Sequence, residues 1–215
     1  MSTYVDEFRG TDKLYYAPIL TDNNEDGEGY TTGEFKQLAP VAEISRTTET
    51  SSATKYYDNK PALTISAEGS DEITLTVPVL DIATLADITG KTVDEATGAL
   101  MDGESVQRYF YLAYRLRLTD GSYRYVARYK VSFQVPDETS ATEDDGTDSN
   151  NQELTVTGIS TNHIFTKPNA SQKALVVDER DGKADCSTFF DQVTTIDNLP
   201  AASDAASNDE NPPTV

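Results

Sequence analysis

The stretch that decides the fold is RYFYLAYRLRLTDGSYRYVARYKVSFQ, residues 108–134. Apolar and polar residues alternate on both sides of its central Asp120-Gly121 dipeptide. Aspartate followed by glycine is typical of a two-residue type I′ turn, because both central residues of that turn need a positive φ. The stretch therefore predicts a β-hairpin with strands Arg108–Thr119 and Ser122–Gln134.

A two-residue turn also determines which residues of the hairpin face one another. One face then carries apolar pairs: Leu118 with Tyr123, Leu116 with Tyr125, Leu112 with Tyr129 and Phe110 with Val131. The other face carries the pairs Arg117 with Arg124, Ala113 with Arg128 and Tyr111 with Lys130. We therefore expect a core face and a basic face. Two like charges opposite each other destabilise such a hairpin unless acidic groups cover them.

Alternation continues through most of the rest of the chain, which favours strands over helices. The other predicted strands are Leu14–Leu20, Pro40–Thr50, Leu63–Glu68, Ile73–Val79, Leu154–Phe165 and Leu175–Arg180. Pro78 places its strand at a sheet edge, because proline cannot donate a hydrogen bond to a neighbour. So many short strands predict a mainly β protein, a β-sandwich or partial barrel.

Helix is scarce, and one or two short flanking helices are expected. Asp81 is a good N-cap for a helix Ile82–Thr89, which Gly90 would end. The second candidate is Ser187–Val193, whose apolar side chains could dock on the sheet: Phe189, Phe190 and Val193. Both helices would cover ends of the sheet instead of forming a separate domain.

The domain prediction is a single β-sandwich domain over residues 13–200. An N-terminal arm, residues 1–12, precedes it, and a flexible acidic tail, residues 201–215, follows it. Two long loops, Asp22–Gly33 and Asp137–Glu153, consist almost wholly of polar and acidic residues. Loops of this length inside a domain are usually functional or disordered. Residues 1–10 contain no apolar run, so no signal peptide is expected.

The charge of the chain excludes some functions. Its 37 Asp and Glu outnumber its 17 Lys and Arg, for a net charge of −20. Tight binding to nucleic acid or to an anionic membrane is disfavoured, because both depend on Lys and Arg. The hairpin is the exception at +5, against −25 for the remainder, and it carries six bases: Arg108, Arg115, Arg117, Arg124, Arg128 and Lys130.

Two interpretations of these six bases are open. They could form a solvated strand face, with the stems of the arginines covering apolar surface. Alternatively they are subunit-interface residues, and an acidic loop of a neighbouring copy covers them after long-range electrostatic attraction.

Motifs for catalysis or cofactor binding are missing from the sequence. The only Gly-Lys-Thr, at residues 90–92, lacks the earlier glycine of a phosphate loop, because position 85 is Leu85. His163 is the only histidine and Cys186 the only cysteine, so neither a catalytic triad nor a zinc site can be assembled. We therefore expect no enzyme and no cofactor, with His163 a half-buried structural residue and Cys186 a packed or surface thiol.

One segment nearly matches a calcium-binding loop. Asp22, Asn24 and Asp26 occupy ligand positions 1, 3 and 5, and Gly27 occupies the turn position. Position 12, which should be a bidentate glutamate, is Gly33. A solvated turn is the better interpretation, and no metal is expected.

Several short motifs follow one another along the chain: Leu14-Tyr15-Tyr16-Ala17-Pro18-Ile19, Tyr56-Tyr57-Asp58-Asn59, Glu68-Gly69, Glu72-Ile73-Thr74-Leu75, Leu154-Thr155-Val156 and Phe189-Phe190-Asp191-Gln192-Val193. Together with the Tyr- and Arg-rich hairpin and the acidic, Thr-rich loop before Leu154, their order and spacing resemble the major tail (tail tube) proteins of long flexible-tailed bacteriophages. The resemblance covers roughly Lys13 to Pro200.

The resemblance implies a structural virion protein without enzyme activity. Its β-sandwich subunits would form hexameric rings whose inner sheets close into a β-barrel, and the rings would stack into a hollow tail tube. The implied partners are further copies of the chain, the tape measure, tail terminator and distal tail proteins, and transiting viral DNA that is not held tightly. Assembly would occur in the host bacterial cytoplasm, the final location would be the virion, and no membrane is involved.

In such proteins, arms and one long loop contact neighbouring subunits and the next ring. The candidates here are residues 1–10, the loop at 22–33 and the loop at 137–153. In the last of these the inter-ring candidates are Asp137, Glu138, Glu143, Asp144, Asp145 and Asp148. An acidic bore suits a DNA conduit, because it repels the polyanion within a Debye length of about 8 Å at physiological salt.

A different class of function remains open beside this one. The chain could be a monomeric β-sandwich binding module, carbohydrate-binding or adhesin-like, in which Tyr109 and Tyr111 stack on sugars. An enzyme is the third class, and the sequence supports it least.

Overall fold

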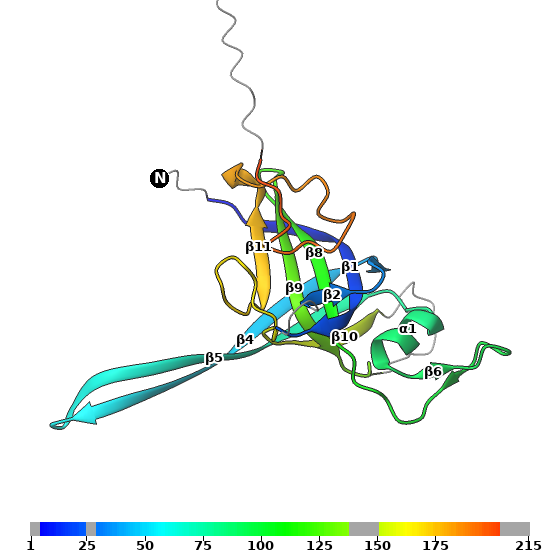
Figure 1. The fold of residues 1–215 in the computed structure, drawn as a ribbon, viewed down its shortest axis with the longest axis horizontal. Helices are drawn as coiled ribbons and strands as arrows, with labels where there is room; N and C mark the ends of the chain where they lie inside the picture. Colours follow the sequence, from blue (N-terminus) through cyan, green and yellow to red (C-terminus); the bar gives the residue numbers. More distant parts are fainter. Residues whose placement is uncertain (1–4, 25–28, 138–150, 203–215) are drawn as a thin grey trace, which may run out of the picture.

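The computed structural model describes residues 5–24, 29–137 and 151–202. The mainly β prediction is confirmed, since one large antiparallel sheet dominates the described residues (Figure 1). Its strand order is β2-β1-β8-β9-β10-β5-β4, with β3 also pairing with β1 and β11 with β9. Its strands are β1 (Phe8–Asp22), β2 (Tyr30–Thr32), β3 (Lys36–Ala39), β4 (Glu43–Tyr57), β5 (Lys60–Val77), β8 (Phe110–Leu118), β9 (Tyr123–Phe133), β10 (Gln152–Gly158) and β11 (Ala174–Asp178). Two further strands, β6 (Thr92–Val93) and β7 (Leu100–Met101), pair with each other in a separate small sheet.

The predicted hairpin is present as β8 and β9, but its loop is one residue longer than expected. The Leu118 N–H donates to the Ser122 carbonyl (2.9 Å), and the Gly121 N–H donates to the Leu118 carbonyl (3.1 Å). Gly121 has a positive φ of 91°, whereas Asp120 does not. This is a three-residue loop, a type I turn followed by a bulge, and the type I′ prediction is wrong. The Asp120 carboxylate instead accepts the Ser122 N–H (2.9 Å).

The longer loop shifts the register by one residue over most of the hairpin. Arg117 faces Tyr123, and Leu116 faces Arg124, so the predicted Arg117–Arg124 pair does not form. A bulge between Phe110 and Leu112 then restores the predicted pairing of Phe110 with Val131. A shift of one residue moves side chains to the opposite face. The prediction of one core face and one basic face is therefore wrong, and both faces of this hairpin are buried.

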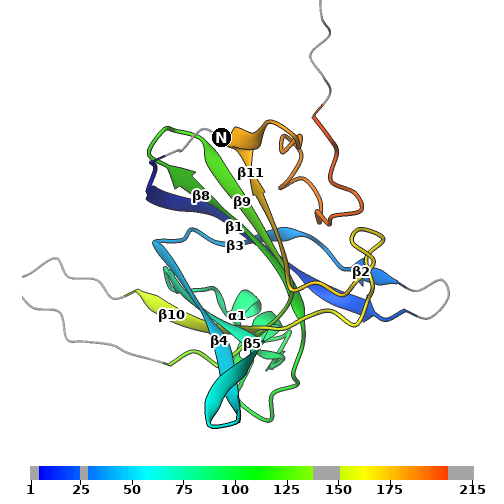
Figure 2. The same ribbon diagram turned by 90° about the vertical axis from the view of Figure 1, so that its left-hand side faces the viewer.

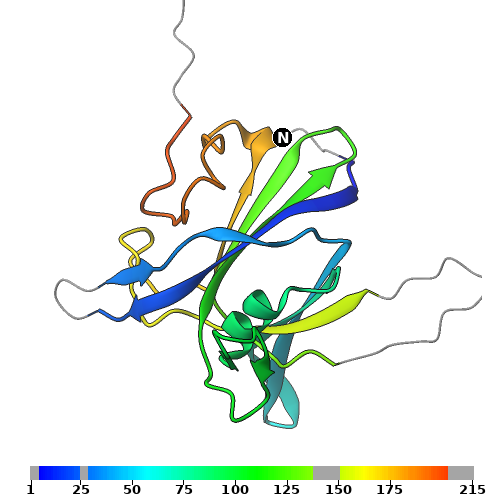
Figure 3. The same cartoon turned by 90° about the vertical axis from the view of Figure 1, so that its right-hand side faces the viewer.

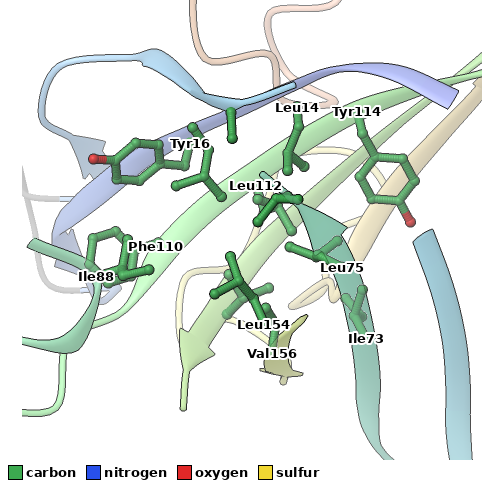
Figure 4. Packing of buried hydrophobic residues seen from close by; sticks show 14 of the residues in the cluster. Leu14, Tyr16, Ile73, Leu75, Ile88, Phe110, Leu112, Tyr114, Leu154 and Val156 are labelled. Carbon is green, nitrogen blue, oxygen red and sulfur yellow. The ribbon is translucent and has the colours of Figure 1, made fainter. Parts of the chain in front are cut away.

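The first core lies inside the curled sheet. The half containing β1, β8 and β9 bends toward the half containing β10, β5 and β4, as Figures 2 and 3 show. Aliphatic and aromatic side chains from both halves meet between them (Figure 4). The fully buried ones are Leu14, Tyr16, Ile73, Leu75, Val77, Phe110, Leu112, Val131, Leu154 and Val156. This arrangement is consistent with the predicted sandwich or partial barrel.

A second, aromatic core covers the other face of β8 and β9. Tyr111, Tyr125 and Tyr129 pack there against Phe165 and Phe189 from the C-terminal segments. The predicted docking of Phe189 is thus confirmed, with 1% of the residue exposed. Residues 187–193 form turns, so the second predicted helix is wrong. Helix nucleation is costly, and a segment this short forms a helix only where packing favours one.

The helix α1 (Ile82–Thr89) has the predicted bounds. The Asp81 carboxylate accepts the Thr84 N–H (2.6 Å), which satisfies a free donor of the first turn. Gly90 ends the helix at a φ of 67°, and its N–H is directed to the carbonyls of Ala86 and Asp87. This helix lies against one end of the first core, to which it contributes Ile88. No helix in the described ranges has the length and apolar character needed to cross a lipid bilayer.

The longest element is the β4–β5 hairpin, which projects from the body of the molecule (Figure 1). The sequence predicted three strands here, Pro40–Thr50, Leu63–Glu68 and Ile73–Val79, where the structure has two continuous ones. Asp58 and Asn59 join them, with positive φ values of 49° and 61°. These values make a type I′ turn, which matches the twist of the two strands.

Three other boundaries differ from the prediction. β1 begins at Phe8, inside the segment predicted as an arm, because Phe8 pairs with Leu118 of β8. β10 ends at Gly158, so His163 lies in a turn and not in a strand. β11 ends at Asp178, and a single 3₁₀ turn, Glu179–Asp181, follows it.

Candidate functional site

Five of the six hairpin bases form ion pairs with aspartates of the same chain. The pairs are Arg108 with Asp87 (3.2 Å), Arg115 with Asp12 (2.6 Å), Arg124 with Asp178 (2.8 Å), Arg128 with Asp71 (2.8 Å) and Lys130 with Asp22 (2.6 Å). The register shift allows this, because it spreads the bases over both faces and toward acids of neighbouring elements. The interface interpretation places such acids on a neighbouring copy, whereas the chain itself supplies them at these five positions.

Asp71 is the most buried of these acids and binds side chains from several elements. It lies in β5, is 2% exposed, and accepts hydrogen bonds from Arg128 of β9 (2.8 Å) and from Thr48 of β4 (2.9 Å). Arg46 of β4 approaches the same carboxylate at 3.2 Å. A buried carboxylate is tolerated when charged donors surround it in this way. Asp71 therefore fixes the base of the projecting hairpin to the main sheet.

Asp22 is held in a similar way at the end of β1. Its carboxylate accepts the Lys130 ammonium (2.6 Å) and the N–H groups of Asn162 (2.9 Å) and His163 (2.9 Å). Burial raises the pKa of Asp22, but the hydrogen bonds from Lys130 and from these N–H groups outweigh it and lower that pKa. Asp22 thus connects β1 to the turn that follows β10.

In the segment that nearly matches a calcium-binding loop, the side-chain oxygens of Asp22 and Asn24 accept hydrogen bonds from the protein itself. Asp22 binds Lys130 and backbone N–H groups, and the Asn24 side-chain oxygen accepts the Ile164 N–H (2.7 Å). Both oxygens thus serve as acceptors that dock the 162–164 turn. Asp26 lies outside the described residues. Within the described ranges, no group of three or more His, Cys, Asp or Glu side chains is placed to bind a metal ion.

A third cluster of charges lies at the far end of the hairpin. Arg124 and Arg180 both bind the Asp178 carboxylate, at 2.8 Å and 2.6 Å. The hydrogen bond from Arg180, together with that from Arg124, holds the pKa of Asp178 well below its ordinary value. Arg180 also pairs with Asp6 (3.0 Å), so this cluster attaches the segment before β1 to β11. The predicted N-terminal arm is therefore docked at Asp6 and along β1.

Arg117 and Arg108 are the exposed members of the six, and of these two only Arg108 has an ion-pair partner in the described ranges. No acidic side chain within the described ranges lies at ion-pair distance from Arg117, which lines a shallow depression with Arg9 and Tyr123. The neighbouring Arg115 guanidinium lies over the Tyr123 ring at 3.8 Å from the ring centre. Arg117 is thus the one hairpin base whose charge faces solvent without a described partner.

The predicted inter-ring residues fall mostly outside the described residues. Asp137 is exposed and follows the end of β9. The others, Glu138, Glu143, Asp144, Asp145 and Asp148, are not described by the structure. Their role in contacts between rings stays a prediction.

The residues weighed for other chemistry are packed into the fold. Tyr111 is fully buried, and its hydroxyl donates to the Thr194 carbonyl (2.9 Å), so it cannot stack on a sugar. His163 is half-buried as predicted, and one ring nitrogen lies 3.1 Å from the Asn23 carbonyl. Burial raises the pKa of the Cys186 thiol to about 11, which disfavours the reactive thiolate. Lys91, after the end of α1, pairs with Asp102.

The feature that the sequence analysis missed is the outer part of the β4–β5 hairpin, residues 49–69, called the ribbon below. Every residue of the ribbon is exposed. Its register places Ala53 opposite Ile65 and Lys55 opposite Leu63 on one face. Thr54 opposite Thr64 and Ser52 opposite Ser66 lie on the other. The Asp58-Asn59 dipeptide was the available signal for this hairpin, because both residues tolerate a positive φ better than most.

The ribbon therefore has an apolar face and a hydroxyl face. Leu63 and Ile65 are 52% and 53% exposed on the first, and Tyr56 and Tyr57 at the tip are 66% and 65% exposed. An isolated two-stranded hairpin is marginally stable in water, and large exposed apolar groups mark interaction surfaces. No protein-family model matches the chain, and no curated protein matches its sequence.

Proposed function

We propose that this protein is a structural subunit that assembles with copies of itself into stacked hexameric rings, forming the hollow tail tube of a long flexible-tailed bacteriophage. The observation that carries the proposal is the ribbon. It extends from the sheet with all its residues exposed, and Leu63, Ile65, Tyr56 and Tyr57 each keep more than half of their surface in solvent. A partner surface would bury them and stabilise the two strands.

The edges of the sheet support the same proposal. β4 is an edge strand of 15 residues, so its outer backbone N–H and C=O groups are free to pair with a further strand. Long exposed edges invite such pairing, and closing strands of several subunits into one barrel removes the edges. A long free edge would promote aggregation of a monomer, whereas in an assembly it can pair with a strand of the next subunit.

The distribution of charge supports a conduit for DNA. Ten of the 17 Lys and Arg side chains form ion pairs with aspartates of the described chain, which leaves acids in large excess at the surface. Paired bases cannot neutralise phosphates without losing their aspartates. DNA would therefore pass such a surface without being held.

The test is to purify the chain and raise its concentration while measuring sedimentation velocity and imaging negatively stained samples. Rings or tubes with a central channel are the expected result. Particles that stay monomeric at every concentration would contradict the proposal and favour the β-sandwich binding module. A duplex DNA probe added to the assembled particles should remain unbound at physiological salt.

A further inference from the structure

Exposed apolar side chains gather at two ends of the molecule. One end is the ribbon. The other is the segment 79–106, called the flap below, which comprises α1, β6 and β7 with their connections. Figure 1 shows the ribbon and the flap at opposite ends of the long axis. The large exposed apolar residues of the flap are Val79 (80%), Ile82 (49%), Met101 (52%) and Val106 (63%).

The two ends also differ in charge. The tip of the ribbon presents Lys55 and Lys60 on either side of the single acid Asp58. Residues 92–106 of the flap contain four acids and no base: Asp94, Glu95, Asp102 and Glu104. Lys55, Lys60, Glu95 and Glu104 are exposed, and none has an ion-pair partner within the described ranges. A basic, apolar tip and an acidic, apolar flap are complementary.

We propose that the ribbon of one copy docks by its apolar face on the flap of a second copy. Leu63, Ile65 and Tyr57 would contact the apolar side chains of the flap, and Lys55 and Lys60 would lie near Glu95 and Glu104. At about 3.3 Å per residue, residues 50–57 span roughly 25 Å, so the ribbon extends well beyond its own body. The inference rests on the proposed self-assembly and names its surfaces.

The position of the two surfaces determines the kind of assembly. A contact between different patches of identical chains is heterologous, and it leaves a free ribbon and a free flap at the two ends of each growing complex. Such a contact produces a closed ring or an open filament, and not a simple two-fold dimer. The hydroxyl face of the ribbon stays in solvent, because Ser52, Thr54, Thr64 and Ser66 lose no hydrogen bonds to water there.

The first test compares the two faces of one strand. The variant Leu63→Gln/Ile65→Gln removes the apolar face, and the control Thr64→Gln/Ser66→Gln alters the hydroxyl face of the same strand by the same residue type. All four positions are exposed, so both variants should keep the circular dichroism and melting temperature of the wild type. Sedimentation velocity should show self-association weakened by roughly tenfold or more in the first variant only.

The second test identifies the flap by exchanging charges. Lys55→Glu/Lys60→Glu makes the ribbon acidic, and Glu95→Lys/Glu104→Lys makes the flap basic. Each variant alone pairs like charges in every contact, so each should fail to assemble. An equimolar mixture pairs opposite charges in every contact and should assemble again.

The outcomes separate this inference from the proposed function. The role of the apolar face would be overturned if the wild type assembles and both glutamine variants associate as strongly as it does. It would also be overturned if both variants associate more weakly than the wild type to the same extent. A charge-exchange mixture that stays dispersed would overturn the flap as the receptor. A wild-type chain that never associates would overturn the proposed function itself.

Discussion

Asp71 and Arg128 are 57 positions apart in the sequence, yet their side chains form an ion pair of 2.8 Å between Oδ2 and Nη1, with both residues buried. The pair joins β5, at the base of the ribbon, to β9 in the centre of the sheet. Removing Asp71 leaves the buried Arg128 guanidinium without the charge that balances it. A substitution at Asp71 is therefore expected to destabilise the fold.

Asp71→Asn is expected to lower the free energy of unfolding by about 3–5 kcal/mol, because Arg128 and Arg46 lose the charge that balances them. Chemical denaturation followed by circular dichroism measures this change. The control is Arg108→Gln, which breaks an exposed pair with Asp87 and should cost about 0–1 kcal/mol. Equal effects of the two substitutions would contradict the structural role assigned to Asp71.

Acid should destabilise the protein through Asp178 and Asp22. The pKa of each carboxyl is lowered in the folded state, by Arg180 and Arg124 at Asp178 and by Lys130 and backbone N–H groups at Asp22. A lowered folded-state pKa contributes stability above the unfolded pKa of about 3.9, and that contribution is lost as the pH falls through the folded-state pKa. Melting temperatures should therefore decline below about pH 4. The decline should be shallower in Asp178→Asn, and an unchanged slope would refute this assignment.

Replacing Gly90, the residue that ends α1, should destabilise the protein more than replacing Gly98. The φ of Gly90 is 67°, and a Cβ added there would lie 1.9 Å from the Val106 carbonyl oxygen. Gly98 has a similar φ of 70° with nothing within 4 Å of such a Cβ, so it is a matched control. Gly98→Ala should cost about 1–2 kcal/mol from the left-handed conformation alone. Gly90→Ala should cost clearly more in the same thermal unfolding assay, because the loop at Val106 must also move.

The aromatic core should depend on Phe189, which no regular element carries. Phe189→Ala is expected to cost about 3–5 kcal/mol, because the side chain is buried among Tyr125 and its neighbours. Ile65→Ala, on the exposed ribbon, should leave the stability of the monomer nearly unchanged. If Phe189→Ala unfolds at the denaturant concentration of the wild type, the C-terminal segment does not form part of the core.

Local patterns in the sequence were sufficient for several features. The cap at Asp81, the helix Ile82–Thr89 and the stop at Gly90 follow from residues within one or two turns of each other. The alternation in residues 108–134 predicted the hairpin. The apolar side chains of Phe189, Phe190 and Val193 predicted a segment that docks on the sheet. These features depend on short-range hydrogen bonds and on side-chain periodicity, which a sequence displays directly.

Tertiary structure decided the rest. Whether the loop at Asp120 has two residues or three is a small local difference, and burial of both hairpin faces selects the register that places Leu112 opposite Arg128 instead of Tyr129. The partners of the hairpin bases, such as Asp71 for Arg128, come from distant strands that no local pattern identifies. The β4–β5 hairpin is continuous because its two strands pair along their whole length. The polar residues within them led the sequence pattern to predict three shorter strands instead. The sequence by itself thus determined a mainly β chain with one capped helix and an acidic excess, and long-range packing determined where its charges are paired and which surface stays exposed.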